Sequence, residues 1–212
     1  ELIVNSKMAW SGPVKLRLFY RAIEDPNDKI LVSRVVNPNG SIDILESDGN
    51  LDSAVDYGIE LSGTYSLASV LPGAKIDWLY LLSEQRVEDP VVPNMTRMLN
   101  QNDFSKIDVK FRQDIPGSSW AWGMDFFLSR TTGLWRLDQR IHRLSRPGNL
   151  DAFIQNKDIF GLDVNLRVMN LLDEEDNISR LVWNGTRADN LELQENRFRY
   201  SGRAIRLTVS GS

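Results

Sequence analysis

The chain has 212 residues and a formal net charge of −4, and it contains one histidine and no cysteine. This charge gives no reason to expect a nucleic-acid partner. The absence of cysteine excludes disulfides, thiol nucleophiles and thiolate metal sites, and the single histidine excludes a multi-histidine metal site within one chain. No stretch approaches the ~18 consecutive apolar residues of a helical membrane span, but the strands of a membrane barrel are only half apolar, so composition does not argue against one.

The first 53 residues predict two strands and a long loop. Residues 1–10 form a weaker strand, and a Ser-Gly-Pro turn at 11–13 precedes a second strand at 14–22. Apolar residues occupy one parity of this second strand, and basic residues dominate the other. Residues 24–53 are rich in Asn, Asp, Gly and Pro, which predicts a loop with room for a short hairpin around the Asn-Pro-Asn-Gly sequence at 37–40.

The strongest strand signal lies at residues 54–67. Apolar and polar residues fall on opposite parities, as expected for a strand with one apolar and one polar face. The apolar set is Tyr57, Ile59, Leu61, Tyr65 and Leu67. At about 11–14 residues this strand is roughly twice the usual globular length, and it is long enough to cross a bilayer, for which ~9–11 tilted residues suffice.

Six further segments alternate in the same way, which gives about nine strands in all. These segments are residues 75–87, 105–115, 120–129, 150–158, 162–172 and 203–212. Short turns alternate with long polar segments, which predict loops at 84–103, 130–149 and 173–196. An outer-membrane barrel has this asymmetry, with short turns on the periplasmic side and long loops outside, whereas a soluble sandwich has no reason to keep all its long loops at one end.

These features favour an all-β fold, an antiparallel up-and-down transmembrane β-barrel. Residues 1–212 would supply a segment of about 8–10 strands, with long loops on one side and short turns on the other. Aromatic residues near strand ends support the membrane version, because such residues gather at membrane interfaces. We assign this role to Tyr65, Trp78, Trp120 and Trp122. Periodicity alone is equally compatible with a soluble barrel whose apolar face points inward.

Two short motifs and the last strand resemble the family of TonB-dependent outer-membrane receptors. Residues 168–173 (VMNLLD) resemble the signature of its penultimate strand, and residues 57–60 (YGIE) resemble a common strand opening. The residues that carry the two motifs are Tyr57, Gly58, Glu60, Asn170, Leu171 and Asp173. The last strand matches the family's terminal pattern except that the family ends on an aromatic residue in phase, so we expect one further residue of this kind after Ser212.

By this resemblance the chain is the C-terminal part of an outer-membrane β-barrel domain, located in the bacterial cell outer membrane. The plug domain and the first dozen or so of the family's roughly 22 strands would lie outside it. The resemblance implies import of a scarce nutrient, such as a ferric siderophore, haem, cobalamin or a carbohydrate. TonB, acting through the plug, would supply the energy, and the other partners would be outer-membrane lipid and lipopolysaccharide.

Residues 130–149 carry many basic side chains and a single acid. The candidate ligand-binding residues among them are Arg136, Arg140, His142, Arg143 and Arg146. Arginine binds carboxylates and phosphates through paired N–H groups, so we expect an extracellular loop that meets an anionic substrate or lipopolysaccharide phosphate. The alternative interpretation is a solvated loop that simply rests on an anionic membrane surface.

No motif indicates catalysis or a bound metal. The chain lacks a Gly-x-Ser-x-Gly nucleophile elbow, and the four acids at 173–176 lack the spacing of a calcium loop. We therefore predict no enzyme activity, no cofactor and no metal. Two other functions stay open: a self-contained small pore or adhesion barrel in the outer membrane, and a soluble β-sheet ligand-binding module.

Overall fold

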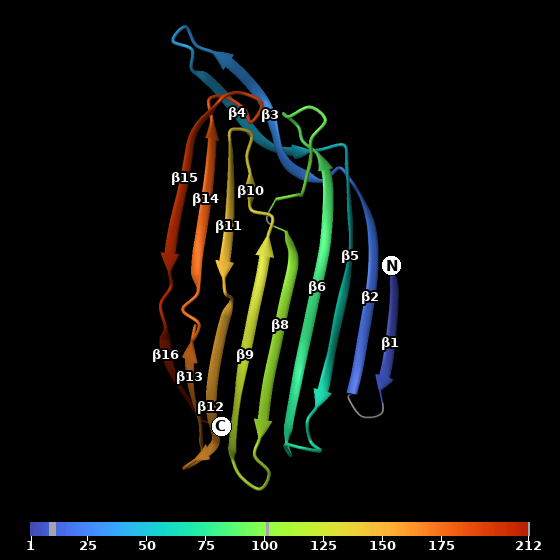
Figure 1. Cartoon of the computed structure of the whole chain (residues 1–212), viewed down its shortest axis with the longest axis vertical. Coiled ribbons are helices and arrows are strands. Elements are labelled where there is room, and N and C mark those ends of the chain that lie inside the picture. The colour runs from blue at the N-terminus through green and yellow to red at the C-terminus, as the bar shows by residue number, and fades with distance from the viewer. Residues whose placement is uncertain (9–11, 101, 212) are drawn as a thin grey trace.

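The computed structural model describes residues 1–8, 12–100 and 102–211, and their regular structure is β-strand. The largest sheet, called the main sheet below, is antiparallel (Figure 1). Its strands in spatial order are β1 (Leu2–Met8), β2 (Gly12–Glu24), β5 (Ser53–Ser66), β6 (Ala74–Glu88), β8 (Asp103–Asp114), β9 (Trp120–Thr131), β12 (Asn149–Ile159), β13 (Leu162–Met169) and β16 (Ala204–Gly211), and β7 (Thr96–Arg97) pairs with β6 beside this path. The described residues form no helix of the length and apolarity needed to cross a membrane.

The nine strands of this path correspond to the nine strands predicted from alternation, which confirms the all-β, antiparallel part of the expected fold. β1 and β16 are the two edge strands, so the sheet formed by the described residues is open. The first residue of the predicted turn at 11–13 lies outside the described residues. The last two residues of the predicted strand at 1–10 lie outside them as well. Ser212 also lies outside them.

Short and long connections leave the main sheet at opposite ends, as the sequence predicts (Figure 1). Residues 67–73, 115–119 and 160–161 join neighbouring strands at what we call the turn end. The connections at the opposite end, the loop end, all contain further strands. The asymmetry of the connections is therefore a property of the fold as well as of the sequence.

The connection between β2 and β5 is a hairpin of β3 (Asn27–Val36) and β4 (Ile42–Asn50), which confirms the hairpin predicted there. Gly40 has a φ of +85° and donates its backbone N–H to the carbonyl of Asn37 at 3.0 Å. Glycine suits this position because other residues rarely adopt a positive φ. The hairpin projects beyond the loop end of the main sheet (Figure 1).

The prediction of loops at 130–149 and 173–196 is wrong. β10 (Leu134–Trp135), β11 (Gln139–Arg146), β14 (Glu175–Trp183) and β15 (Leu191–Tyr200) form a second antiparallel sheet in that order. Alternation does not reveal these strands because polar residues occupy both of their faces. In Figure 1, β11, β14 and β15 lie above β12, β13 and β16, so the second sheet prolongs the main sheet at its loop end.

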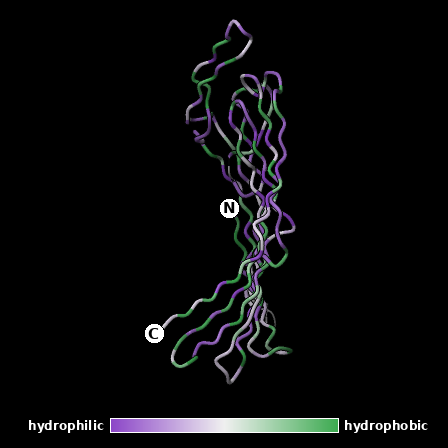
Figure 2. The backbone as a smooth tube through the Cα atoms, turned by 90° about the vertical axis from the view of Figure 1, so that its left-hand side faces the viewer, coloured by the Kyte–Doolittle hydropathy of each residue, from purple (hydrophilic) through white to green (hydrophobic). Residues whose placement is uncertain are grey.

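Register places most apolar residues of the main sheet on one face. Leu18 pairs with Ile59, which pairs with Leu82, and four strands further along Leu166 pairs with Leu207. Figure 2 views the main sheet edge-on as a single layer, and no second layer of described residues packs on either face. Leu82 is therefore 46% exposed and Leu207 63% exposed. We call this the apolar face and its opposite the polar face.

Two glycines make room for aromatic rings on the polar face. Gly58 pairs directly with Phe19, and Gly123 pairs directly with Phe153. A Cβ atom at either glycine would lie 2.7 Å from the ring of its partner, which no real side chain allows. Glycine–aromatic pairs of this kind let a sheet bend without leaving a gap. The glycine of the YGIE motif thus has a packing role.

Candidate functional site

The polar face of the main sheet carries two clusters in which a phenylalanine lies between two arginines. In the first, the guanidinium carbons of Arg17 and Arg21 lie 5.0 Å and 4.9 Å from the ring centroid of Phe19. Arg17 is 3.4 Å from Glu60, and Arg21 is 2.5 Å from Asp56. Each arginine therefore combines a cation–π contact with an ion pair to the neighbouring strand.

The second cluster repeats this arrangement across β8, β9, β12 and β13. Arg112 and Arg167 lie 5.6 Å and 5.1 Å from the ring centroid of Phe153. Arg167 donates to Asp125 at 2.7 Å and to Asp151 at 3.2 Å. The arginines of both clusters are therefore paired with carboxylates of the same or nearby strands on the polar face.

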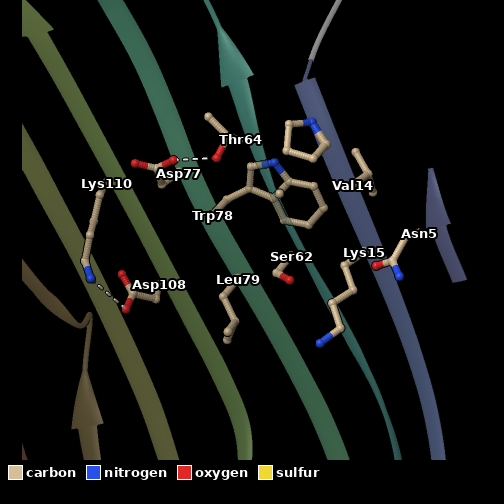
Figure 3. Close-up of a pocket in the computed structure, with 12 residues that line it drawn as sticks. Asn5, Val14, Lys15, Ser62, Thr64, Asp77, Trp78, Leu79, Asp108 and Lys110 are labelled. Carbon is tan, nitrogen blue, oxygen red and sulfur yellow. Dashed lines mark hydrogen bonds and ion pairs between the residues drawn. The ribbon is translucent and has the colours of Figure 1, made fainter. Parts of the chain in front are cut away.

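A groove of about 850 Å³ lies toward the turn end of the polar face (Figure 3). Thr64 donates to Asp77 at 2.6 Å, and Lys110 is 3.4 Å from Asp108. Lys15 extends from β2 toward β5 in the same groove. The lining combines these polar groups with the apolar side chains of Val14, Trp78 and Leu79. Each carboxylate already has its own cationic or hydroxyl partner, so the groove holds no carboxylate pair arranged for acid–base chemistry.

The loop end contains four charged side chains and one aromatic side chain with almost no solvent exposure. These residues, which we call the loop-end cluster, are Asp28, Asp89, Arg97, Arg187 and Trp135. Arg97 is 2.9 Å from Asp28 and 3.2 Å from Asp89, and Arg187 donates to Asp89 at 2.5 Å. The side chains of Arg97 and Asp89 are 1% and 0% exposed. Charges at this depth persist only when they are paired and hydrogen-bonded, so the cluster fixes how the loop-end segments meet.

Hydrogen bonds set the charge state of Asp89. Burial by itself raises the pKa of this carboxyl, but the bond from Arg187 and the backbone N–H groups of Val91 and Val92 outweigh it. The pKa of Asp89 therefore lies below its ordinary value. Burial lowers the pKa of Arg187 despite its bond to Asp89, yet a guanidinium stays protonated at neutral pH.

Trp135 is the aromatic centre of the cluster. The guanidinium carbons of Arg140, Arg187 and Arg97 lie 4.2 Å, 5.0 Å and 5.9 Å from the centroid of its ring. Asn100 donates to the carbonyl of Trp135 at 3.0 Å and accepts from its backbone N–H at 2.5 Å. Each of the three cations is attracted to the π-electrons of the ring, which stabilises the cluster. The cations also repel one another, which opposes this stabilisation.

Polar contacts also attach the β3–β4 hairpin to the other loop-end segments. Glu46 accepts from the Nε of Arg136 at 2.5 Å and from the backbone N–H of Leu137 at 3.1 Å. Arg34 donates to Asp189 at 2.8 Å. Segments that are 90 and 155 residues apart in the sequence are thus joined by single side chains.

The structure separates the five predicted ligand-binding residues instead of presenting them on one loop. Arg136 is engaged by Glu46. Arg140 and His142 share one face of β11, and Arg143 projects from the opposite face, 4.0 Å from an oxygen of Asp176. The fifth, Arg146, ends β11 and precedes Pro147 in a cis peptide bond. Of the predicted set, only the Arg140 and His142 side chains lie beside each other.

Burial and charge shape the chemistry of that pair. Burial, together with the charge of Arg187, lowers the pKa of Arg140. Burial and the charge of Arg140 lower the pKa of His142, so this imidazole is neutral at pH 7.

Residues 168–173, the VMNLLD motif that resembles a receptor signature, form the corner where β13 leaves the main sheet. Asn170 is buried with a φ of +57°, and Asp173 has a φ of +55°. Asn170 donates from its amide to the carbonyl of Gly202 at 2.8 Å and accepts from the backbone N–H of Glu174 at 2.8 Å. Asn and Asp tolerate a positive φ better than other side chains. The motif residues therefore fix a turn and tie it to the segment that leads into β16.

The four predicted interface aromatics gather toward the turn end, namely Tyr65, Trp78, Trp120 and Trp122. The indole N–H of Trp122 donates to Gln113 at 2.7 Å, and its ring centroid is 4.9 Å from that of Phe111. Trp78 packs over Gly63, its direct partner on β5. All four therefore lie at one end of the apolar face, and their role at a membrane interface stays a prediction.

Sequence reasoning missed the loop-end cluster entirely. Its members come from β3, β7, β10 and two loops, and no local pattern marks any of them as buried. The consecutive acids at 173–176 also behave differently from a single polar loop, because Asp176 belongs to β14 and accepts a hydrogen bond from Ser145. Within residues 1–8, 12–100 and 102–211, no three acidic or histidine side chains gather as metal ligands would.

Comparison of the chain with protein-family models, with curated proteins and with solved structures finds no significant match. Assignment of a function therefore rests on the geometry described above and on the resemblance of the short motifs.

Proposed function

We propose that this chain is part of the wall of an outer-membrane β-barrel of the TonB-dependent receptor type, and that the complete barrel imports a scarce small-molecule nutrient. The observation that carries this proposal is the uncovered apolar face, which crosses all nine strands of a meander whose short turns share one end. Proteins in water rarely expose a continuous apolar surface of this extent. Lipid is the partner that would cover such a sheet face along its whole width.

The aromatic spacing supports a membrane-spanning height. Tyr57 and Tyr65 lie on the apolar face of β5, eight residues apart. At ~3.3 Å per residue this separation is about 26 Å along the strand, or roughly 20 Å of membrane for a strand tilted by about 40°. Barrels carry an apolar band of about 25 Å between two aromatic girdles. Tyr20 pairs with Tyr57 at one end of this interval, and Trp78 lies near the other.

The polar face and the loop end support the remainder of the proposal. The ion pairs and phenylalanine–arginine clusters suit a wall that faces water or a polar plug inside the barrel. The loop-end segments, which would be extracellular, are held in one arrangement by buried charges, as a ligand-selective opening requires. Import energised by TonB is proposed from the resemblance at 57–60 and 168–173.

Cell fractionation tests the membrane part of this proposal. The native protein should appear in the outer-membrane fraction, dissolve only with detergent, and migrate faster on a gel when unheated than when boiled. A band much larger than this chain supports the receptor, whereas a band of the chain's own size would favour the self-contained pore. A protein in the aqueous fraction without a heat-dependent shift contradicts the proposal and leaves the soluble binding module.

Cross-linking tests the energy source. In living cells the native protein should form a covalent adduct with TonB when a cross-linker is added, and this adduct should be absent from cells lacking TonB. A membrane barrel that never cross-links to TonB would retain the barrel assignment and overturn the import mechanism.

A further inference from the structure

A small pocket lies between β11 and β14 in the second sheet. Arg140, His142, Ser179 and Leu181 line its volume of about 190 Å³. Arg140 pairs directly with Leu181, and His142 pairs directly with Ser179, so all four side chains project from one face of two adjacent strands. Rigid strands, rather than a loop, therefore fix the polar groups relative to one another.

Arg140 has no anionic partner among the described residues. No ion pair forms within 4.0 Å of its guanidinium, and its buried Nε atom has no hydrogen-bond acceptor. Trp135 covers one face of the guanidinium at 4.2 Å, which supplies attraction but no acceptor for its N–H groups. A buried donor with a full positive charge and no acceptor is an unfavourable state that a bound anion would relieve.

The surrounding charges show the same deficit. Three arginines, Arg97, Arg140 and Arg187, meet the ring of Trp135. Asp28 and Asp89 engage Arg97 and Arg187, and neither pairs with Arg140. Within this group of three arginines and two aspartates one positive charge is left over, and it is the one that borders the pocket.

We propose that Arg140, His142 and Ser179 bind a single oxyanion group, a phosphate or a carboxylate. The guanidinium supplies the charge and paired N–H donors, and the hydroxyl of Ser179 adds a further donor. The neutral imidazole of His142 supplies one ring N–H, and a second if it takes up a proton. A pocket of this size accepts one acidic group but not a whole siderophore.

This site stands apart from the import proposal, because it depends only on the pocket and its charge. The oxyanion is either free in solution, as a nutrient or its acidic substituent, or part of a lipopolysaccharide phosphate. Both sources share the chemistry that Arg140 recognises, and the experiment distinguishes them.

The test uses the native protein extracted from membranes in detergent, with its histidine imidazoles isotopically labelled; His142 is the one histidine of these 212 residues. Nuclear magnetic resonance of the imidazoles reports on the pocket, and the resonances that disappear in His142→Gln are assigned to His142. Inorganic phosphate should shift the His142 resonances saturably and should raise the pKa of this imidazole, because a bound anion favours the protonated form. Sodium chloride at equal ionic strength should produce neither change.

Variants assign the effect to the pocket. Arg140→Gln should weaken phosphate binding at least tenfold, and Ser179→Ala should weaken it by a smaller factor. Arg143→Gln is the matched control, because Arg143 lies three residues away on the opposite face of β11 and is 54% exposed; it should bind phosphate like the parent chain. If Arg140→Gln does not fold, Arg140→Lys keeps the charge without the paired donors and should bind several-fold more weakly.

A parallel titration with micelles that contain lipid A distinguishes the two sources. Arg140-dependent shifts with inorganic phosphate indicate a free anion, and such shifts with lipid A alone indicate a lipopolysaccharide phosphate. The proposal is overturned if neither probe shifts His142, or if the shifts persist unchanged in Arg140→Gln.

Discussion

The main sheet and the loop end place polar groups in opposite ways. On the main sheet, apolar side chains such as Leu82 and Leu207 are exposed on one face while ion pairs line the other. At the loop end, Asp89 and Arg97 are almost fully buried. The difference teaches that the two regions satisfy their side chains in different ways. The main sheet leaves its apolar face uncovered by the described residues, whereas Asp28, Asp89, Arg97 and Arg187 are paired with one another at the loop end.

The largest expected effect comes from breaking the loop-end cluster. Arg97→Met removes the cation next to both Asp28 and Asp89, and removing one member of a buried ion pair typically costs about 3–5 kcal/mol. The amide hydrogens of β3 should then exchange at least about a hundredfold faster, since 1.4 kcal/mol corresponds to a factor of ten. Arg197→Gln is the control, because its ion pair with Glu195 is exposed and its loss should leave exchange unchanged.

A second substitution checks the cause. Adding Asp28→Asn to Arg97→Met should restore part of the protection, because it removes the carboxylate charge that lost its partner Arg97. Asp89 keeps its bond from Arg187 at 2.5 Å in both variants. Unchanged exchange in β3 for the single variant would show that the cluster does not hold the hairpin in place.

A charged residue on the apolar face should have the next largest effect. Leu61 lies midway between Tyr57 and Tyr65 on that face, and an arginine facing lipid at the bilayer midplane costs roughly 2–4 kcal/mol. Leu61→Arg should lower the yield of heat-resistant folded protein and its unfolding free energy in detergent or lipid. Ser62→Arg, one residue along on the polar face, should be nearly neutral, and equal effects at both positions would argue against a lipid-covered face.

Filling a glycine gap on the polar face should destabilise the sheet moderately. A Cβ at Gly58 would lie 2.5 Å from the carbonyl oxygen of Leu82 and 2.7 Å from the ring of Phe19. Overpacking of this kind costs about 1–3 kcal/mol, so Gly58→Ala should lower the denaturant midpoint. Gly211→Ala is the control and should leave the midpoint unchanged, because its Cβ would meet Leu162 at an ordinary 3.5 Å. An equal fall of the midpoint in both variants would show that crowding at Gly58 is not the cause.

The smallest expected effect is a dependence of the loop end on pH. The pKa of Asp89 is lowered by its bonds to Arg187 and the backbone, so the opened state binds more protons than the closed state between the two pKa values. Protection of β3 should be constant above about pH 5 and fall as the pH drops below the ordinary aspartate value of about 4. Asp89→Asn should flatten this dependence, and a parent chain with no acid dependence would contradict the assignment.

Alternation predicted the main sheet because each of its strands has one apolar and one polar face. Residues 54–67 show this most clearly, and register then aligns Ile59 with Leu18 and Leu82. The same criterion fails for β11 and β14, whose polar residues lie on both faces. Those strands are fixed by pairing with each other and by continuity with β12 and β13, neither of which leaves a local signal.

The loop-end cluster could not be predicted because its partners are distant in the sequence. Asp28 and Arg97 are 69 residues apart, and Asp89 and Arg187 are 98 residues apart. Isolated charges in polar segments normally indicate solvent exposure, and here the fold buries them. The excess of arginine at 130–149 drew attention to five residues, of which the structure places Arg140 and His142 side by side, but the sequence could not show that Arg136 is occupied by Glu46.

The most direct test of the central claim is to ask what covers each face of β5. The chain has no cysteine, so a spin label can be placed at Leu61→Cys and, separately, at Ser62→Cys in the protein reconstituted into lipid. Paramagnetic resonance should find the label at Leu61 accessible to oxygen dissolved in the bilayer, and the label at Ser62 accessible to a water-soluble nickel complex. A label at Leu61 that water reaches, or that neither lipid nor water reaches, would contradict the membrane-facing assignment of the apolar face.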